Sequence, residues 1–100
     1  MDEYQVTCIF KPDDSSPHDD ITHIGNLEDQ WCMTVRGAIY QIEKKVSKFY
    51  VLDHSMKIRC YLEIVRELGK QPYLKAHVAA RWTDILLAQG RCNENCRLIA

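Results

Sequence analysis

Hydrophobic and polar residues alternate along two stretches of the chain, and this pattern predicts β-strands. In the segment 3–10, Tyr4, Val6 and Cys8 fall on one face, and the segment 57–66 alternates with equal regularity. A period of two residues is typical of a strand that buries one of its faces. Short runs rich in β-branched and aromatic residues predict three further strands, at 21–24, 49–52 and 73–78.

The period changes to that of an α-helix in the middle of the chain. Thr34 is a favourable N-cap residue. The apolar residues that follow it recur at helical spacing, namely Val35, Ala38, Ile39, Ile42 and Val46. A second helix is predicted over 82–89, because Gly90 follows as a typical C-terminal stop. The predicted order of elements is therefore β-β-α-β-β-β-α.

The connections indicate how these elements assemble. Short turns between the later strands favour antiparallel pairing, whereas the polar, proline-containing segment 11–20 predicts a loop. An amphipathic helix covers one face of such a sheet. We therefore expect a single α+β domain over residues 1–100. It should have a small antiparallel sheet of about four to five strands, one amphipathic helix packed on a face and a short C-terminal helix.

Charge and hydropathy exclude several classes of protein. The chain carries 13 Lys and Arg against 14 Asp and Glu, so no overall field attracts nucleic acid or anionic lipid. No apolar run approaches the ~20 residues of a membrane span. The segment Met1 to Tyr4 has no features of a secretory signal. We expect a cytoplasmic protein without membrane contact, and its low net charge leaves a homodimer open.

The five cysteines predict reduced thiols rather than a disulfide framework, because their number is odd and no signal precedes them. Cys92 and Cys96 would share one face of a helix. With His77 they are weak candidates for metal ligands, since the other ligands of a zinc site are missing. We predict no metal and no cofactor, although this cysteine pair could oxidise to a labile disulfide.

A second polar group, His77, Arg81 and Asp84, lies in the same third of the chain. Neighbouring charges could tune the protonation of the histidine, which leaves a small metal-dependent hydrolase as one hypothesis. No nucleophile stands at a recognisable spacing, and Thr83 has no nucleophile elbow around it. The alternative is a capping network in which Asp84 faces the first turn of the last helix. We predict no catalytic residue.

One basic group could bind nucleic acid. It consists of Arg36, Lys44, Lys45 and Lys48, with tyrosines nearby that could stack on bases. The alternative is a solvated helix face on which Glu43 offsets the lysines.

The two tryptophans are the largest anchors in the chain. Protein interfaces are enriched in tryptophan and arginine. The candidate protein-binding residues are Trp31, Trp82, Arg81 and Asp84, and the alternative is that each tryptophan packs in the core.

Several short motifs follow one another along the chain. They are Tyr4-Gln-Val-Thr-Cys8-Ile, Ile21-Thr-His-Ile-Gly25, Ala38-Ile39 with Ile42-Glu43, Phe49-Tyr50-Val51 and the tract from Tyr73 to Cys92. In this order the chain resembles a small bacterial domain family of unknown function, family 3892 of the unknown-function series. Members of that family carry motifs of the types ITHIGG, FYV and ADG-x-x-x-DNLL-x-LP-x-C. The resemblance covers nearly the whole chain and implies a bacterial protein without an established activity.

The chain departs from these motifs at several positions. Asn26 replaces the second glycine of ITHIGG, and Ala79 and Ala80 replace the acidic residue and glycine of ADG. Ile85 replaces the asparagine of DNLL, whereas Asp84 remains. The resemblance is therefore to a diverged member, and the lost polar residues weigh against an enzyme.

These observations lead to three functional hypotheses. The first is a non-catalytic cytoplasmic protein-interaction module of bacterial or phage origin, whose size would suit an anti-defence inhibitor of a larger host complex. The second is a nucleic-acid-binding domain that uses the basic helix face. The third is the small metal-dependent hydrolase.

Overall fold

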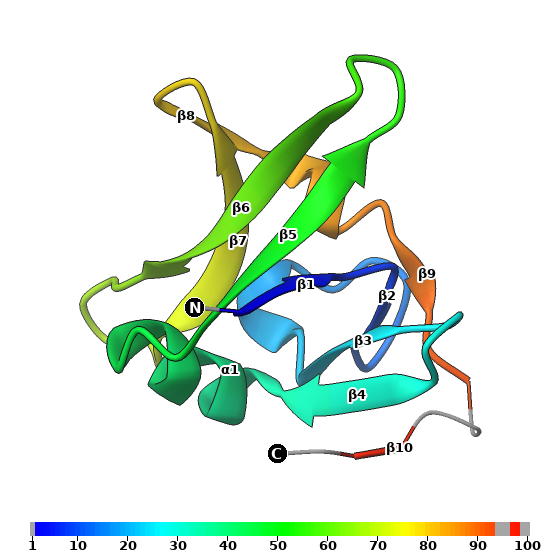
Figure 1. Cartoon of the computed structure of the whole chain (residues 1–100). Helices are drawn as coiled ribbons and strands as arrows, with labels where there is room; N and C mark the ends of the chain where they lie inside the picture. Colours follow the sequence, from blue (N-terminus) through cyan, green and yellow to red (C-terminus); the bar gives the residue numbers. More distant parts are fainter. Residues whose placement is uncertain (1, 94–96, 99–100) are drawn as a thin grey trace.

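The structure is a computed structural model that describes residues 2–93 and 97–98. Within these residues it contains two five-stranded sheets, one α-helix and two short 3-10 helices (Figure 1). The elements in chain order are β1 (Asp2–Gln5), β2 (Cys8–Phe10), η1 (His18–Asp20), β3 (His23–Asn26), β4 (Trp31–Thr34), α1 (Val35–Glu43), β5 (Ser47–Asp53), β6 (Ile58–Val65), β7 (Tyr73–Val78), β8 (Arg81–Thr83), η2 (Asp84–Leu86), β9 (Gly90–Arg91) and β10 (Arg97–Leu98).

The first sheet has the strand order β1-β5-β6-β7-β8. Its strands β5 to β8 form an antiparallel meander, and β1 pairs with β5 in parallel. Buried and exposed residues alternate along the central strands, as the sequence predicts for 57–66. The sheet therefore has one face against the core and an outer face that is open to solvent.

The second sheet has the strand order β10-β4-β3-β2-β9. Strands β2, β3 and β4 pair antiparallel, whereas the two-residue strands β9 and β10 join the edges in parallel. Eight of the eleven residues of β2, β3 and β4 are buried. The paired residues Phe10, His23 and Thr34 are half-buried, so one face of this sheet is covered and the other is covered in part. The α+β class is consistent with this structure, but the strands form two mixed sheets rather than one antiparallel sheet.

The predicted strand 3–10 is divided between the two sheets. The Val6 amide donates to the Tyr50 carbonyl at 2.7 Å, in the first sheet. The next amide, that of Thr7, donates to the Gly25 carbonyl at 2.9 Å, in the second sheet. One amphipathic segment thus links the sheets by changing partners between two consecutive residues.

The helix α1 begins as predicted and ends earlier. The Thr34 hydroxyl accepts a hydrogen bond from the Gly37 amide at 3.0 Å, which is the expected N-cap. At the other end Lys45 adopts a positive φ of 57°. The Val46 amide then bonds the Gln41 carbonyl in the pattern of a Schellman motif. The helix therefore stops at Glu43, and Val46 lies outside it.

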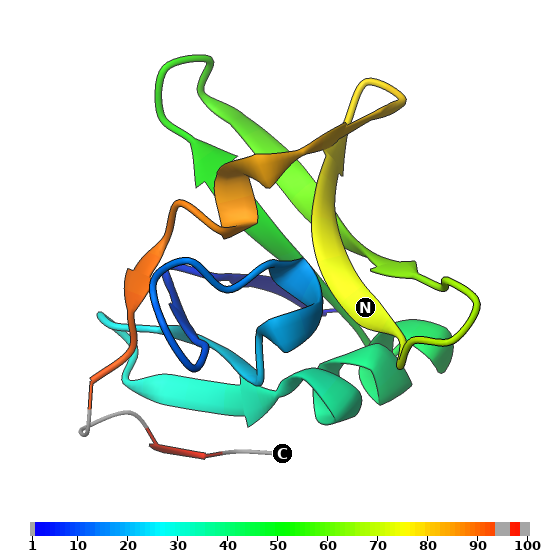
Figure 2. The same ribbon diagram turned by 180° about the vertical axis from the view of Figure 1, so that it is seen from behind.

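Both sheets and α1 contribute to one apolar core. Its largest fully buried side chains are Phe49, Ile9, Ile24, Met33, Leu74 and Leu86. The helix contacts β5 and β7, and η1 lies beside β7 on the side of the molecule seen in Figure 2. None of the helices in the described part of the chain is long and apolar enough to cross a membrane.

The predicted C-terminal helix over 82–89 is wrong. This segment forms the end of β8, the single 3-10 turn η2 and the turn that leads to β9. The Thr83 hydroxyl, not the Asp84 carboxylate, accepts from the first free amide of the turn, that of Ile85, at 3.3 Å. Leu86 is fully buried, so its anchoring in the core stabilises a turn too short to persist alone.

Candidate functional site

The outer face of the first sheet carries a group of polar and aromatic side chains that could recognise a ligand. Tyr50 lies opposite Tyr61, and Tyr61 lies opposite His77. His77 in turn pairs with Trp82 on the edge strand β8. Because side chains at paired positions project to the same face, a row of four rings crosses this sheet.

Charged side chains join this row at β1, β5 and β6. The Tyr61 hydroxyl donates to Glu3 Oε1 at 2.6 Å, and Arg59 Nη1 lies 2.8 Å from the same oxygen. The Arg59 guanidinium lies 4.4 Å from the centre of the Tyr50 ring, and Lys48 Nζ lies 5.4 Å from that of Tyr61. The two tyrosines are thus covered by cations that a carboxylate holds nearby.

These contacts also change the acidity of the groups. The hydrogen bond from Tyr61 and then the Arg59 guanidinium lower the pKa of Glu3. The same hydrogen bond raises the pKa of Tyr61. Both shifts favour a carboxylate and a neutral phenol, so this group keeps one charge state at neutral pH.

A second pair lies across the face. His77 Nδ1 is 3.0 Å from Glu63 Oε2, and the His77 ring meets Trp82 edge-on at a centroid distance of 5.0 Å. The carboxylate fixes the orientation of the imidazole, while Trp82 remains 48% exposed. The predicted trio of His77, Arg81 and Asp84 is therefore not formed, because the partner of His77 comes from β6.

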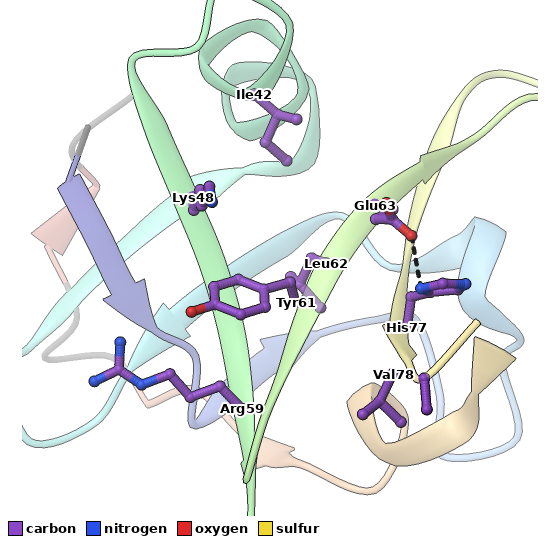
Figure 3. A pocket seen from close by; sticks show the side chains of 9 residues that line it. Ile42, Lys48, Arg59, Tyr61, Leu62, Glu63, His77 and Val78 are labelled. Atoms are coloured by element: carbon purple, nitrogen blue, oxygen red, sulfur yellow. Dashed lines mark ion pairs between the residues drawn. The ribbon is translucent and has the colours of Figure 1, made fainter. Parts of the chain in front are cut away.

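A cavity of about 450 Å³ lies between these groups. Figure 3 shows Lys48, Tyr61 and Arg59 on one side and the Glu63–His77 pair on the other. Ile42 from α1 and Val78 border it with apolar surface. No serine, threonine or cysteine occurs among the described residues that line it. The cavity can hold a side chain or small group by ring contacts and charges of both signs.

The hairpin between β7 and β8 ends this face, and its two loop residues are positions at which the chain departs from the motif that it resembles. Val78 pairs with Arg81, and the two loop residues Ala79 and Ala80 have positive φ values of 49° and 63°. Such a two-residue turn favours Asp-Gly or Asn-Gly. The acidic residue and glycine of the ADG motif fall on these positions. Their replacement by alanine alters the turn, and at position 79, which lines the cavity, it leaves a methyl group where the resembled motif has an acidic residue.

The predicted protein-binding residues do not share one surface. Trp31 is 9% exposed and packs against Tyr4 and Phe49 with centroid distances of 5.8 and 6.4 Å. It is a core residue and is not available to a partner in this conformation. Arg81 and Asp84 are exposed beside Trp82, and Asp84 lies 3.7 Å from Lys75.

The predicted basic group is also divided. Arg36 lies in the first turn of α1, beside Pro72, and Lys44 caps the other end, where its ammonium group lies 5.8 Å from the Tyr40 ring. Lys48 is not helical, because β5 begins at Ser47, and it belongs to the outer face of the first sheet. Lys45, also outside α1, is the left-handed residue that ends it.

The cysteines correct another expectation. Cys92 is joined to Cys8 by a disulfide between residues 84 positions apart, so it is not available as a metal ligand in this state. Cys32 and Cys60 are buried thiols, as expected of small apolar side chains. Cys96 lies outside the described residues. Within 2–93 and 97–98, no three His, Cys, Asp or Glu side chains are arranged to hold a metal ion.

Sequence reasoning missed Glu63, Arg59 and Tyr61, which are central to this face. The regular alternation of 57–66 already places these three residues on one side of a strand. That signal predicts a shared face, but not which neighbouring strand supplies its partners. His18 was also missed; it is buried in η1, and its Nε2 has no hydrogen-bond partner within the described structure.

Comparison with known proteins identifies no relative of this chain. No protein-family model matches the chain, and neither a curated protein nor a solved structure matches it significantly.

Proposed function

We propose that the protein is a non-catalytic binding module that recognises a partner protein through the outer face of its first sheet. The observation that carries this proposal is the row of Tyr50, Tyr61, His77 and Trp82. Tyrosine, tryptophan and arginine dominate the binding energy of protein interfaces. A rigid sheet presents these rings with little conformational entropy left to lose on binding.

The charges of this face favour a protein over nucleic acid. Arg59 is already paired with Glu3, and His77 with Glu63. A phosphate backbone that approached Arg59 or His77 would also meet the carboxylates of Glu3 and Glu63. Nucleic-acid surfaces gain affinity by releasing counterions through an excess of cations, whereas a protein partner can supply complementary charges of both signs.

The same face supports the proposal of a protein without catalytic activity. The Glu63–His77 pair could orient an imidazole, but no serine, threonine or cysteine occurs beside it among the described residues that line the cavity. Activated nucleophiles require such a group within hydrogen-bond reach of the base. Within 2–93 and 97–98, no three His, Cys, Asp or Glu side chains are arranged to hold a metal ion, so a small metal-dependent hydrolase is the least supported of the three hypotheses.

Origin and location belong to this proposal as well. The motif resemblance suggests a bacterial protein. The small size of the chain would suit a phage inhibitor that covers a site on a larger host complex. A cytoplasmic location stays a prediction. The Cys8–Cys92 disulfide is the feature that weighs against it, because a reducing cytosol seldom preserves such bonds.

Matched surface variants test this function. The immobilised protein would capture partners from a bacterial lysate, and the same capture would use Tyr61→Ala/Trp82→Ala. Loss of two interface anchors should weaken binding by at least about 30-fold, the equivalent of ~2 kcal/mol. The control is Met56→Ala/Leu68→Ala, which removes two exposed apolar side chains from turns elsewhere.

The outcome separates the hypotheses. A protein retained by the control and lost by Tyr61→Ala/Trp82→Ala supports the proposed face. Capture that is abolished by nuclease, or by raised salt together with Lys48→Ala, would transfer the assignment to nucleic acid. Equal capture by both double variants would refute the proposed face.

A further inference from the structure

Three cysteines meet at one place in the second sheet. Gly25 in β3 pairs with Cys8 of β2 on one side and with Cys32 of β4 on the other. Residues paired in this way project from the same face of the sheet. Cys8 and Cys32 therefore flank a glycine, which leaves the space between their side chains unfilled by β3.

Cys92 occupies that space. A Cβ atom built on Gly25 would lie 3.0 Å from Cys92 Sγ and 3.1 Å from Cys32 Cβ. It would also lie 2.5 Å from the Trp31 carbonyl oxygen, so only glycine fits there. The Cys92 sulfur, which is bonded to Cys8, therefore lies over Gly25 of β3 and next to the Cys32 side chain.

The three side chains share one enclosed environment. Cys8 is fully buried, and Cys92 and Cys32 are 3% and 6% exposed. External thiols therefore have little access to the disulfide, whereas Cys32 is already adjacent to it. Cys60 is also a buried thiol, but it lies in β6 of the other sheet.

We propose that Cys8, Cys92 and Cys32 form a thiol–disulfide exchange centre in which Cys92 changes partner between the two strands that flank Gly25. Cys32 loses its proton and its sulfur attacks Cys92 Sγ. The Cys32–Cys92 bond forms as the Cys8–Cys92 bond breaks. Cys8 leaves as a thiolate and takes up the proton. One disulfide and one thiol are present before and after, so the step consumes no oxidant and no reductant.

The path of the chain fits such a transfer. Before Cys92, β9 pairs with β2, and the Cys92 amide donates to the Ile9 carbonyl at 3.1 Å. After it, β10 pairs with β4, where Leu98 lies opposite Cys32. The C-terminal segment therefore reaches both outer strands of the β2-β3-β4 unit (Figure 1). Exchange would shift its covalent attachment from β2 to β4.

Disulfide mapping of the full-length oxidised protein tests this proposal. All proteins would carry Cys96→Ser, so that no fifth sulfur competes for Cys92. The decisive variant adds Cys8→Ser. We expect it to lose two hydrogens on oxidation and to yield a peptide that links Cys32 to Cys92. A Cys92–Cys60 link, or alkylation of all three remaining cysteines after oxidation, would overturn the proposal.

A second measurement does not depend on the folding of that variant. The parent with Cys8 intact would be incubated natively, quenched in acid, denatured and labelled with a maleimide. Exchange predicts that label appears on Cys8 at the expense of Cys32, at a rate that rises roughly tenfold per pH unit while the attacking thiol is mostly protonated. Cys32→Ser should abolish the label on Cys8, and Cys60→Ser should leave it unchanged. Label confined to Cys32 and Cys60 at every time would contradict the exchange.

Discussion

The two sheets share one core but use their second faces in different ways. In the second sheet Cys92 and its disulfide cover part of the far face, and most residues of β2, β3 and β4 are buried. In the first sheet the far face is open and carries paired charges and aromatic rings. This more extensive burial makes the second sheet the more sensitive to a change of side-chain volume. The first sheet can vary its outer residues while its inner face keeps the fold.

The largest effect that this comparison predicts is at the disulfide. Closing a loop between residues 84 apart stabilises the folded state by about 4–5 kcal/mol in the chain-entropy model. Cys92→Ala should therefore lower the free energy of unfolding by about that amount in urea titrations. Reductant should destabilise the wild type to a similar extent and leave Cys92→Ala unchanged. If reductant leaves the free energy of unfolding of the wild type unchanged, the cross-link does not stabilise the second sheet.

A matched pair of alanine variants compares the sheets directly. Ile24, in β3, is fully buried, so Ile24→Ala should cost about 2–5 kcal/mol. Glu63, in β6, lies on the outer face of the first sheet and pairs with His77, so Glu63→Ala should cost less than about 1 kcal/mol. Urea unfolding of both variants measures the difference. Equal losses of stability in the two variants would mean that the outer face is needed for folding. The reason for proposing an interface there would then no longer hold.

The β7–β8 turn predicts a smaller effect in the opposite direction. Ala80 has a φ of 63°, a region that is unfavourable for residues with a Cβ atom. Ala80→Gly should relieve this strain and raise the free energy of unfolding by roughly 0.5–1 kcal/mol, after the extra chain entropy of glycine is subtracted. Ala88→Gly, outside the turn, is the control and should not stabilise. A lower free energy of unfolding for Ala80→Gly would show that Ala80 is not strained in the folded protein.

The smallest expected effect is a pH dependence at His18. Burial, and then the charge of Lys75, lower the pKa of His18 below its ordinary value of 6.5, while Asp84 and Asp19 partly offset them and Lys11 adds to them. The unfolded state therefore binds more protons than the folded state as pH falls through about 6.5. The contribution of His18 to the free energy of unfolding is therefore present above about pH 6.5 and is lost as the pH falls below it.

The measurement is the urea midpoint at about pH 7.5 and about pH 5.5. We expect the midpoint of the wild type to fall more than that of His18→Gln between these values. The carboxylates whose pKa is lowered, Glu3, Asp13, Asp53 and Glu67, titrate below this window and contribute little to it. An identical fall in both proteins would exclude His18 as its source.

Local patterns of the sequence were enough to predict several elements of the fold. The alternation of 57–66 and the apolar run at 73–78 predicted β6 and β7, and Thr34 predicted the start of α1. These signals are sufficient because the period of side chains and the cap of a helix depend on neighbouring residues alone. The strand β4 was missed, since Trp31-Cys-Met-Thr34 is too short to show a period.

Contacts between distant segments decided the rest. The sequence by itself determined a mixed α+β domain, the apolar faces of its strands and the side chains that share the outer face of β6. Only the tertiary structure decided that 3–10 divides between two sheets, that Trp31 is buried and that Glu63 is the partner of His77. It also decided that Cys92 meets Cys8 beside Cys32. The physical reason is that pairing partners and burial depend on which strands lie side by side, and no local pattern records that choice.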